Sequence, residues 1–319
     1  MRKTLVFGLL VLAFILFYVI QGWSGAGPAT RPVDVLIPRG SSVAGAADIL
    51  KQAGAISSSR RFLVQAKLLG RGGSIKAGEY RIPAHASDRQ ILALLESGKT
   101  LQRYVIVPEG LPAVLVRERL LAAPELTGGL AIPDEGSVLP DAYAYQRGET
   151  RAAVLARMQA AMTRALDRLW PARGPGLPVQ SRREAVILAS IVEKETGKAS
   201  ERPTIAGVYE NRLRTGMPLQ ADPTIIYPIT RGKPLGRRIL ESEVHARNAY
   251  NTYAMAGLPA GPIANPGKAS IAAVLHPATT SALYFVADGT GGHVFADTLA
   301  GHQANVAKWY SIRRSRGEM

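Results

Sequence analysis

The stretch that most constrains this chain is residues 181–196, SRREAVILASIVEKET. Ser181 followed three residues later by Glu184 is a capping-box pattern, which predicts that a helix begins here. From Ala185 to Val192 every residue is apolar except Ser190. A helix that is apolar on nearly all sides is normally buried, so this segment predicts a central, buried helix.

Two carboxylates, Glu193 and Glu195, stand at the end of this helix, where Gly197 is the expected terminator. Leu188, Val192 and Glu195 are spaced i, i+4, i+7, so Glu195 continues the apolar stripe whereas Glu193 turns to another side. The helix dipole and burial both raise the pKa of such a carboxyl, and a carboxyl that is protonated near neutral pH is a general acid. Taken alone, the stretch also fits two solvated charges at a frayed helix end, which is the commoner situation.

The composition restricts the partners and the chemistry. Lys and Arg number 39 against 24 Asp and Glu, and the net charge of +15 favours anionic partners such as nucleic acid, anionic lipid or an acidic polymer. The chain has no cysteine, which excludes disulfides, thiol catalysis and cysteine-ligated zinc. Its 319 residues can hold a sizeable core and about two domains.

The N-terminus has the pattern of a membrane anchor. Two basic residues precede an uncharged apolar run, Thr4 to Ile20, which is long enough to cross the hydrocarbon core of a bilayer. The basic residues predict a cytoplasmic N-terminus, so the rest of the chain is expected to be exported. A cleaved signal peptide is the alternative, and because it also exports the chain, nucleic acid is disfavoured as the anionic partner. Residues 1–23 are therefore predicted to be the anchor and residues 24–32 a linker.

Residues 33–100 are predicted to form a small α+β module. The expected order is strand, helix, helix, strand and a further helix, at 33–37, 41–53, 59–70, 76–83 and 87–97. Nothing in this module has a catalytic pattern, so a binding or spacer role is expected.

Residues 101–319 are predicted to form a larger mixed α+β domain. The expected elements are a strand at 103–107, helices at 111–122, 150–170, 181–196, 200–213 and 298–314, and a hairpin at 283–286 and 293–295. Residues 123–148 are expected to be loop-rich, residues 216–224 a polar loop, and the segments at 250–253, 257–263 and 265–267 irregular. Long irregular loops inside a compact domain are usually functional.

Most enzyme motifs are missing from the sequence. A G-x-S-x-G elbow fails at residues 40–44 because residue 44 is Ala, and the five histidines lack metal-binding spacing. There is no P-loop, no G-x-G-x-x-G and no DNA-reading motif. What remains is a carboxylate in an apolar helix together with loops rich in Asn, Gln, Asp and Tyr. Such loops suit a carbohydrate, because tyrosines stack on sugar rings and amides bond sugar hydroxyls.

The number of carboxylates separates two kinds of glycan cleavage. A glycosidase normally needs two carboxylates that flank the bond, and Asp222 is the candidate for the second. A lytic cleavage needs only one, which protonates the leaving oxygen and then takes a proton from the sugar's own C6 hydroxyl. The C6 oxygen closes a 1,6-anhydro ring, and no water attacks.

An ordered set of motifs runs from the central helix to the end of the hairpin. These segments are Leu188–Thr196, Asn211–Leu213, Gly216–Thr224, Tyr227, Tyr250–Tyr253, Gly257–Pro259, Gly261–Ile263, Asn265–Gly267, His276–Ala278, Tyr284–Val286, Gly292, His293 and Phe295. Upstream motifs are Pro108–Gly110, Glu135, Gly136, Pro140, Asp141 and Tyr143. In this order they resemble the MltG (YceG-like) family of endolytic murein transglycosylases. Residues 33–100 are similar to the family's LysM-like subdomain, and a single N-terminal span is typical of the family.

The resemblance implies an enzyme that cleaves nascent peptidoglycan glycan strands internally, leaves 1,6-anhydro-muramyl ends and so terminates elongation. It implies that the catalytic glutamate is in the E-x-E segment and favours Glu195, in agreement with the apolar stripe. Glu193 and Asp222 are candidates for a second carboxylate. The candidates to bind the glycan are Asn211, Gln220, Asp222, Tyr227, Tyr250, Asn251, Thr252 and His293.

Neither a metal nor a cofactor is implied. The implied partners are peptidoglycan strands and the inner membrane, with a peptidoglycan synthase as a candidate and without nucleic acid. The expected location is the inner (cytoplasmic) membrane, crossed once, with the N-terminus in the cytoplasm and the catalytic domain in the periplasm. Two alternatives remain open: a muramidase that uses water with Asp222 as base, and a non-catalytic peptidoglycan-binding scaffold of the cell-wall synthesis machinery.

Overall fold

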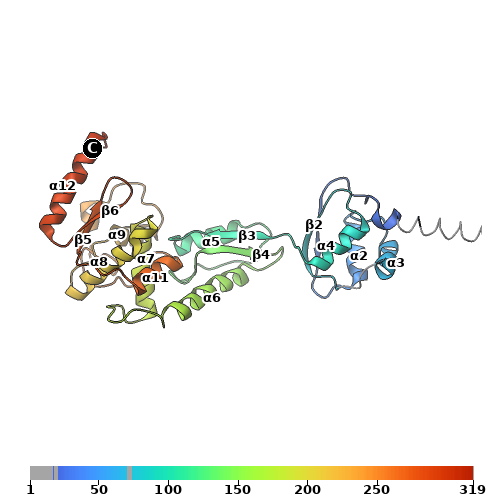
Figure 1. Ribbon diagram of the computed structural model, residues 1–319, viewed down its shortest axis with the longest axis horizontal. Coiled ribbons are helices and arrows are strands. Elements are labelled where there is room, and N and C mark those ends of the chain that lie inside the picture. The colour runs from blue at the N-terminus through green and yellow to red at the C-terminus, as the bar shows by residue number, and fades with distance from the viewer. Residues whose placement is uncertain (1–16, 18–20, 70–73, 319) are drawn as a thin grey trace, which may run out of the picture. The chain divides into compact units, whose positions relative to one another are not determined.

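The computed structural model describes residue 17 and residues 21–69 and 74–318 (Figure 1). The chain divides into two compact units, residues up to 103 with 144–148, and residues 104–143 with 149 onward. Helices and short strands alternate along it, which confirms the predicted mixed α+β class.

The first unit is built on an antiparallel pair of strands with helices packed against it. Its elements are β1 (Val33–Ile37), α2 (Val43–Gln52), α3 (Ser59–Leu69), β2 (Gly78–Ile82) and α4 (Asp88–Ser97). Val35 and Ile37 point into an apolar core shared with the helices, because alternate residues of a strand face one side. The capping box predicted at residues 87–90 is confirmed, since Ser87 Oγ accepts the N–H of Gln90 and Gln90 Oε1 accepts the N–H of Ser87.

From residue 103 onward the chain is mainly helical. The elements are β3 (Arg103–Val107), α5 (Ala113–Ala122), β4 (Asp141–Tyr145), α6 (Arg151–Leu169), α7 (Arg182–Glu195), a 3₁₀ turn η1 (Ala199–Glu201), α8 (Arg202–Thr215), α9 (Asp222–Thr230), α10 (Glu241–Val244), α11 (Lys268–Leu275), β5 (Tyr284–Ala287), β6 (His293–Ala296) and α12 (Leu299–Ser315). β3 pairs with β4, and β5 pairs with β6 in the predicted antiparallel hairpin, with Tyr284 opposite Ala296.

The helix α7 is the centre of the second unit. It packs against α8, α9 and α11, which lie around it in Figure 1. All eight residues from Ala185 to Val192 are buried, as the apolar run predicts. Because this helix contributes to the core on every side, its end is a fixed point for the side chains that follow.

The two ends of α7 differ in detail from the sequence prediction. Ser181 Oγ accepts the N–H of Glu184, but the carboxylate of Glu184 accepts the N–H of Gln180 rather than that of Ser181. Only half of the predicted capping box is therefore formed. The helix stops because Thr196 is extended, with φ −139° and ψ 135°, so the expected terminator Gly197 is not what ends it.

Two elements overlap segments that were predicted to be irregular, namely β4 and the first turn of α9, while α10 and α11 lie in stretches for which no element was predicted. The polar loop predicted at 216–224 is shortened because α9 begins at Asp222, with a proline in its first turn and Pro228 in its interior. Proline is compatible with the first turn of a helix, where its missing N–H costs nothing. The helix α11 has only eight residues and is apolar almost throughout, so its sequence shows no helical periodicity. Packing against α7 and α8 stabilises it.

The predicted membrane-spanning run Thr4–Ile20 lies outside the described residues, apart from Phe17. Within the described part of the chain, no helix combines the length and the hydropathy that a bilayer span needs.

Ser190 gives a stability prediction. It is the polar residue in the buried run of α7, where its hydroxyl donates to the carbonyl of Ile187 (2.7 Å) and accepts the buried N–H of Ile263 (3.0 Å). We expect Ser190→Ala to leave that N–H unpaired and to lower the free energy of unfolding by about 1–3 kcal/mol. Urea denaturation measures this. The control is Ser315→Ala, whose exposed hydroxyl bonds only its own helix, and equal stability of the two variants would contradict the role of Ser190.

Candidate active site

Glu195, the last residue of α7, has a buried carboxyl group. Its Oε1 atom has no hydrogen-bond partner among the described residues, while the hydroxyl of Tyr209 on α8 donates a hydrogen bond to the carboxyl. Burial raises the pKa of Glu195 to about 7; the bond from Tyr209 and the charge of Arg212 oppose this rise, and the negative charge of Asp222 adds to it. Such a group is able to exchange a proton with a ligand near neutral pH.

Arg212 holds the segments around this carboxyl in place. It lies on α8 and is buried. Its Nε donates to the carbonyl of Leu283 at 2.7 Å, and its Nη1 donates to that of Leu219 at 2.6 Å. The guanidinium also lies over the ring of Tyr284, 5.5 Å from the ring centroid. Arg212 therefore joins the segment before α9 to the start of β5 and supplies a positive charge near the buried acid.

Glu195 lines a cavity of about 500 Å³, which we call the Glu195 cavity. Its walls come from the end of α7, α8, the start of α9, β5 and α12. The other lining residues are Tyr209, Arg212, Leu219, Gln220, Asp222, Tyr253, Phe285, Val286, His302, Val306, Trp309, Tyr310 and Arg313. Aromatic rings beside a few hydrogen-bonding groups are a lining that suits a sugar ring.

Two of the predicted site residues, Gln220 and Asp222, lie in this cavity. The hydroxyl of Tyr253 donates to Asp222 Oδ1 at 2.6 Å and so fixes that carboxylate. Gln220 has φ +52°, a left-handed conformation that is uncommon for a residue other than glycine. Thr252 stabilises this backbone conformation with two hydrogen bonds. Its carbonyl accepts the N–H of Gln220 (3.0 Å), and its hydroxyl accepts the N–H of Ala221 (3.1 Å). Thr252, predicted to contact the glycan, is itself buried and shapes the loop instead.

Glu193, the other carboxylate of the pair, is bound to its own protein. Its side chain is 5% exposed and lies 3.4 Å from Nη2 of Arg202. Its Oε2 accepts the N–H of Gly267 at 2.8 Å. A carboxylate that is paired with a cation and bonded to the backbone holds the loop before α11 against α7, so the position of Glu193 is that of a structural residue.

Two predicted glycan contacts, Asn211 and Asn251, use their amides inside the protein. Asn211 Nδ2 donates to the carbonyls of Thr280 (2.8 Å) and Ala282 (3.1 Å). Asn251 is fully buried, and its Nδ2 donates to the carbonyls of residues 243, 244 and 246. Neither lines the Glu195 cavity. Their donors are used to hold loops, and contact of either residue with a glycan stays a prediction.

Tyr227 and Tyr250 form a separate cluster. Their ring centroids are 4.9 Å apart, and the hydroxyl of Tyr227 bonds the buried carboxyl of Glu135. Glu135 Oε1 also accepts the N–H of Ala113 (2.8 Å) and the side-chain amide of Asn265 (3.3 Å). Burial raises the pKa of Glu135 to about 7, against these bonds. The two tyrosines do not line the Glu195 cavity, and their contact with a glycan stays a prediction.

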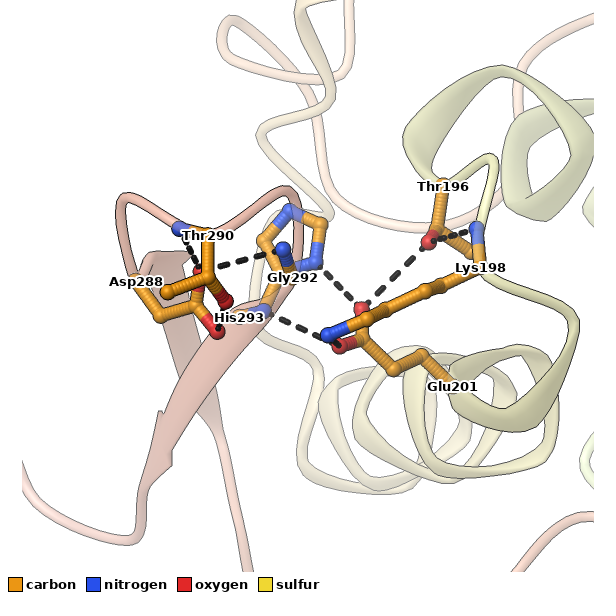
Figure 2. A network of polar contacts seen from close by, with 7 residues as sticks. All are labelled: Thr196, Lys198, Glu201, Asp288, Thr290, Gly292 and His293. Atoms are coloured by element: carbon orange, nitrogen blue, oxygen red, sulfur yellow. Dashed lines mark hydrogen bonds and ion pairs between the residues drawn. The ribbon is translucent and has the colours of Figure 1, made fainter.

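His293 belongs to a network that joins the β5–β6 hairpin to the turn after α7 (Figure 2). Its Nδ1 lies 2.8 Å from Glu201 Oε2, and its N–H donates to Glu201 Oε1 at 3.1 Å. The hydroxyl of Thr196 donates to the same Oε2 at 3.3 Å, and Asp288 accepts the N–H of Gly292 within the turn at 3.0 Å. His293 does not line the Glu195 cavity. It fixes the hairpin against the residue that follows Glu195.

Several cavity residues were not singled out from the sequence. Tyr209 and Arg212 lie on α8, where an Asn-Arg-Leu motif was noted without a role for the arginine. Trp309 and Tyr310 lie on α12, whose pattern is that of an ordinary amphipathic helix. In the described ranges, no three His, Asp or Glu side chains converge as a metal site would require.

Known proteins resemble this chain over most of its length. A profile of the YceG-like family matches residues 35–308. An endolytic murein transglycosylase of Bacillus subtilis is 30% identical over 316 residues, which cover 89% of this chain and 86% of the relative. One of Streptococcus pneumoniae is 29% identical over 86% of this chain, and the match spans 58% of that relative.

A solved structure of a YceG-like protein is also similar to this chain. The crystal structure of a YceG-like protein from Listeria monocytogenes aligns with a TM-score of 0.53 and 25% identity, over 86% of this chain and 99% of that one. The family profile and the relatives therefore agree with the motifs and with the fold, and the chain belongs to the YceG-like family.

Proposed function

We propose that this protein is an endolytic peptidoglycan lytic transglycosylase, which cleaves nascent glycan strands, leaves 1,6-anhydro-muramyl ends and so terminates elongation. Its relatives in Bacillus subtilis and Streptococcus pneumoniae are named endolytic murein transglycosylases. The observation that carries the proposal is the carboxyl of Glu195. It combines burial, an oxygen without a partner and a pKa of about 7 with a place in a cavity lined by aromatic and polar side chains.

In the first step Glu195 acts as a general acid. Its proton passes to the glycosidic oxygen, the bond between that oxygen and C1 of the muramyl residue breaks, and the leaving sugar departs with a free hydroxyl. Positive charge develops at C1, and the carboxylate of Asp222 in the same cavity stabilises it. The hydrogen bond from Tyr209 keeps the Glu195 carboxyl oriented toward the bond that breaks.

In the second step the Glu195 carboxylate acts as a general base. It takes the proton of the C6 hydroxyl of the muramyl residue, and the C6 oxygen forms a bond to C1. The anhydro ring is closed, Glu195 is protonated again, and no co-reactant is consumed. The pKa of about 7 suits both steps, because a group that gives and takes a proton in one cycle works best near the ambient pH.

A hydrolytic muramidase is the second candidate, and Asp222 is the observation that favours it. Asp222 lines the same cavity as Glu195 and lies close enough to raise the pKa of that group. A second carboxylate in this position is able to activate water. The two reactions differ in product mass, since a hydrolysed end is heavier than an anhydro end by one water molecule.

We further propose a membrane-anchored arrangement. Residues 4–20 would anchor the chain in the inner membrane with the N-terminus in the cytoplasm, and the catalytic domain would act in the periplasm beside the synthases that make the strands. The strand–helix–helix–strand order of residues 33–82 supports a LysM-like role in glycan binding for the first unit. Protease protection of spheroplasts tests the orientation, and binding of residues 33–100 to purified glycan tests the role.

The contrast between the two glutamates tests the proposed function. We expect Glu195→Gln to reduce release of anhydro-muropeptides from glycan strands by about 10²–10⁴-fold, because general acid–base catalysis is lost, while the fold is kept. We expect Glu193→Gln to retain cleavage and to lower the free energy of unfolding by about 1–3 kcal/mol, because its pairing with Arg202 is lost. Mass spectrometry of a digest and thermal unfolding measure the two effects. Full turnover by Glu195→Gln would refute the assignment.

The dependence on pH is a second test. If Glu195 must be protonated to start the reaction, kcat/KM falls tenfold per pH unit above about pH 7, where its carboxyl ionises. Asp222 raises this pKa by its negative charge, so Asp222→Asn lowers the pKa and moves the alkaline limb to lower pH. The pH profiles of the wild type and the variant measure the shift. A limb that stays in place or moves to higher pH would exclude this coupling.

A further inference from the structure

A second cavity lies beside the end of α7 and has no role in the mechanism above. Its volume is about 530 Å³, and we call it the Lys194 cavity. The lining residues are Glu109, Gly110, Leu111, Pro112, Leu115, Lys194, Pro223, Ile226, Gly232, Lys233, Pro234, Leu235 and Ile263. Most of them are apolar, and none is aromatic, so this cavity differs in kind from the Glu195 cavity.

The two cavities share their dividing wall. Glu195 lines one and its neighbour Lys194 lines the other. In the same way Asp222 lines the first and its neighbour Pro223 lines the second. Consecutive residues of a helix point to different sides, so the end of α7 and the start of α9 form the partition. A substituent of a sugar held at Glu195 would have to pass over this partition to reach the Lys194 cavity.

Among the residues that the structure describes, Lys194 is the cation at the rim of the Lys194 cavity without an ion pair. Glu109 lies 3.5 Å from Nη2 of Arg202, a guanidinium that it shares with Glu193, and Lys233 Nζ lies 2.7 Å from Glu118 Oε1. Lys194 has neither an ion pair nor a hydrogen bond within the described ranges. An apolar cavity with one unpaired ammonium at its rim is complementary to a ligand that has small apolar groups and a carboxylate.

The substrate of the proposed reaction has such a group beside the bond that breaks. The cleaved bond belongs to C1 of a muramyl residue, and the same sugar ring carries a lactyl ether with a short stem peptide. Alanine methyl groups and carboxylates are regular parts of that peptide. We infer that the Lys194 cavity receives the stem peptide of the muramyl residue whose bond is cleaved, an inference that rests on the proposed function.

The test compares strands that keep their stem peptides with the same strands stripped by an amidase. We expect the wild type to cleave the stem-bearing strands faster. Ile226→Trp fills the cavity, so the methyl groups of the stem peptide lose their apolar contacts there. Loss of one such contact lowers kcat/KM by about tenfold or more, and we expect this reduction on stem-bearing strands. On stripped strands its effect should be much smaller. The matched control is Ile229→Trp, which changes an exposed residue of the same helix outside the cavity and should behave as the wild type on both substrates.

A second variant covers the case in which a tryptophan in the cavity disturbs the fold. Lys194 is exposed, and Lys194→Gln should lower kcat/KM on stem-bearing strands about two- to fivefold, with a larger effect at low salt, because one charge pair near solvent is lost. Stripped strands should not show this dependence on salt. Thermal unfolding of each variant verifies that it is folded.

The possible failures can be told apart. Absence of anhydro ends from both substrates with the wild type would overturn the proposed function itself. Equal cleavage of both substrates by the wild type, with Ile226→Trp indistinguishable from Ile229→Trp, would overturn only the stem-peptide inference. If Ile226→Trp slowed stem-bearing and stripped lipid-linked strands alike, the cavity would hold another part of the strand, such as its polyprenyl end, and the inference would also be wrong.

Discussion

The burial of the Glu195 carboxyl is the constraint on which the site depends. An unpaired carboxylate in a low-dielectric environment is costly, so the group keeps its proton up to a pKa of about 7. The surrounding fold has to be stable without a favourable contribution from this group. The apolar body of α7 supplies that stability, because eight consecutive residues are buried against three other helices. A helix with an alternating polar face would have left its end solvated and the acid ionised.

The neighbouring glutamate, Glu193, is a buried carboxylate whose charge is paired. Glu193 is 5% exposed, but Arg202 pairs with its carboxylate and the N–H of Gly267 donates a hydrogen bond to it. Two residues apart on one helix, one carboxylate is therefore satisfied and the other is left with an unpartnered oxygen. Satisfied groups hold loops, whereas an unsatisfied buried group is available to a ligand. The proposed acid is thus distinguished from its neighbour by the bonds that it does not make.

The sequence predicts the elements whose signals are local. The capping residues and the apolar run of α7, the box at Ser87 and the hairpin strands are of this kind, and so is the position of Glu195 on the apolar stripe. It does not predict α11, whose burial depends on partners far along the chain. It does not show that Asn211 and Asn251 hold loops, because residue type shows that an amide can bond but not whether the protein's own carbonyls already accept its hydrogens. The sequence did not indicate that Tyr209 and Arg212 belong to the site, because tertiary packing rather than any local pattern brings them to Glu195.

The proposed internal cleavage of a long strand adds a requirement that one cavity does not meet. A polymer that is cut in its middle continues on both sides of the broken bond and carries its side groups with it. An acid at the bottom of a single closed pocket would admit only chain ends. In this protein the acid is instead at the end of a rigid helix, and cavities open on two sides of that end. Glu193 bonds the loop before α11. Glu201 bonds both the hairpin and Thr196, the residue that follows α7. Segments on both sides are therefore held against the end of α7. The distance between the acid and each wall is therefore set by the core, which is the condition under which a flexible strand can be held for proton transfer.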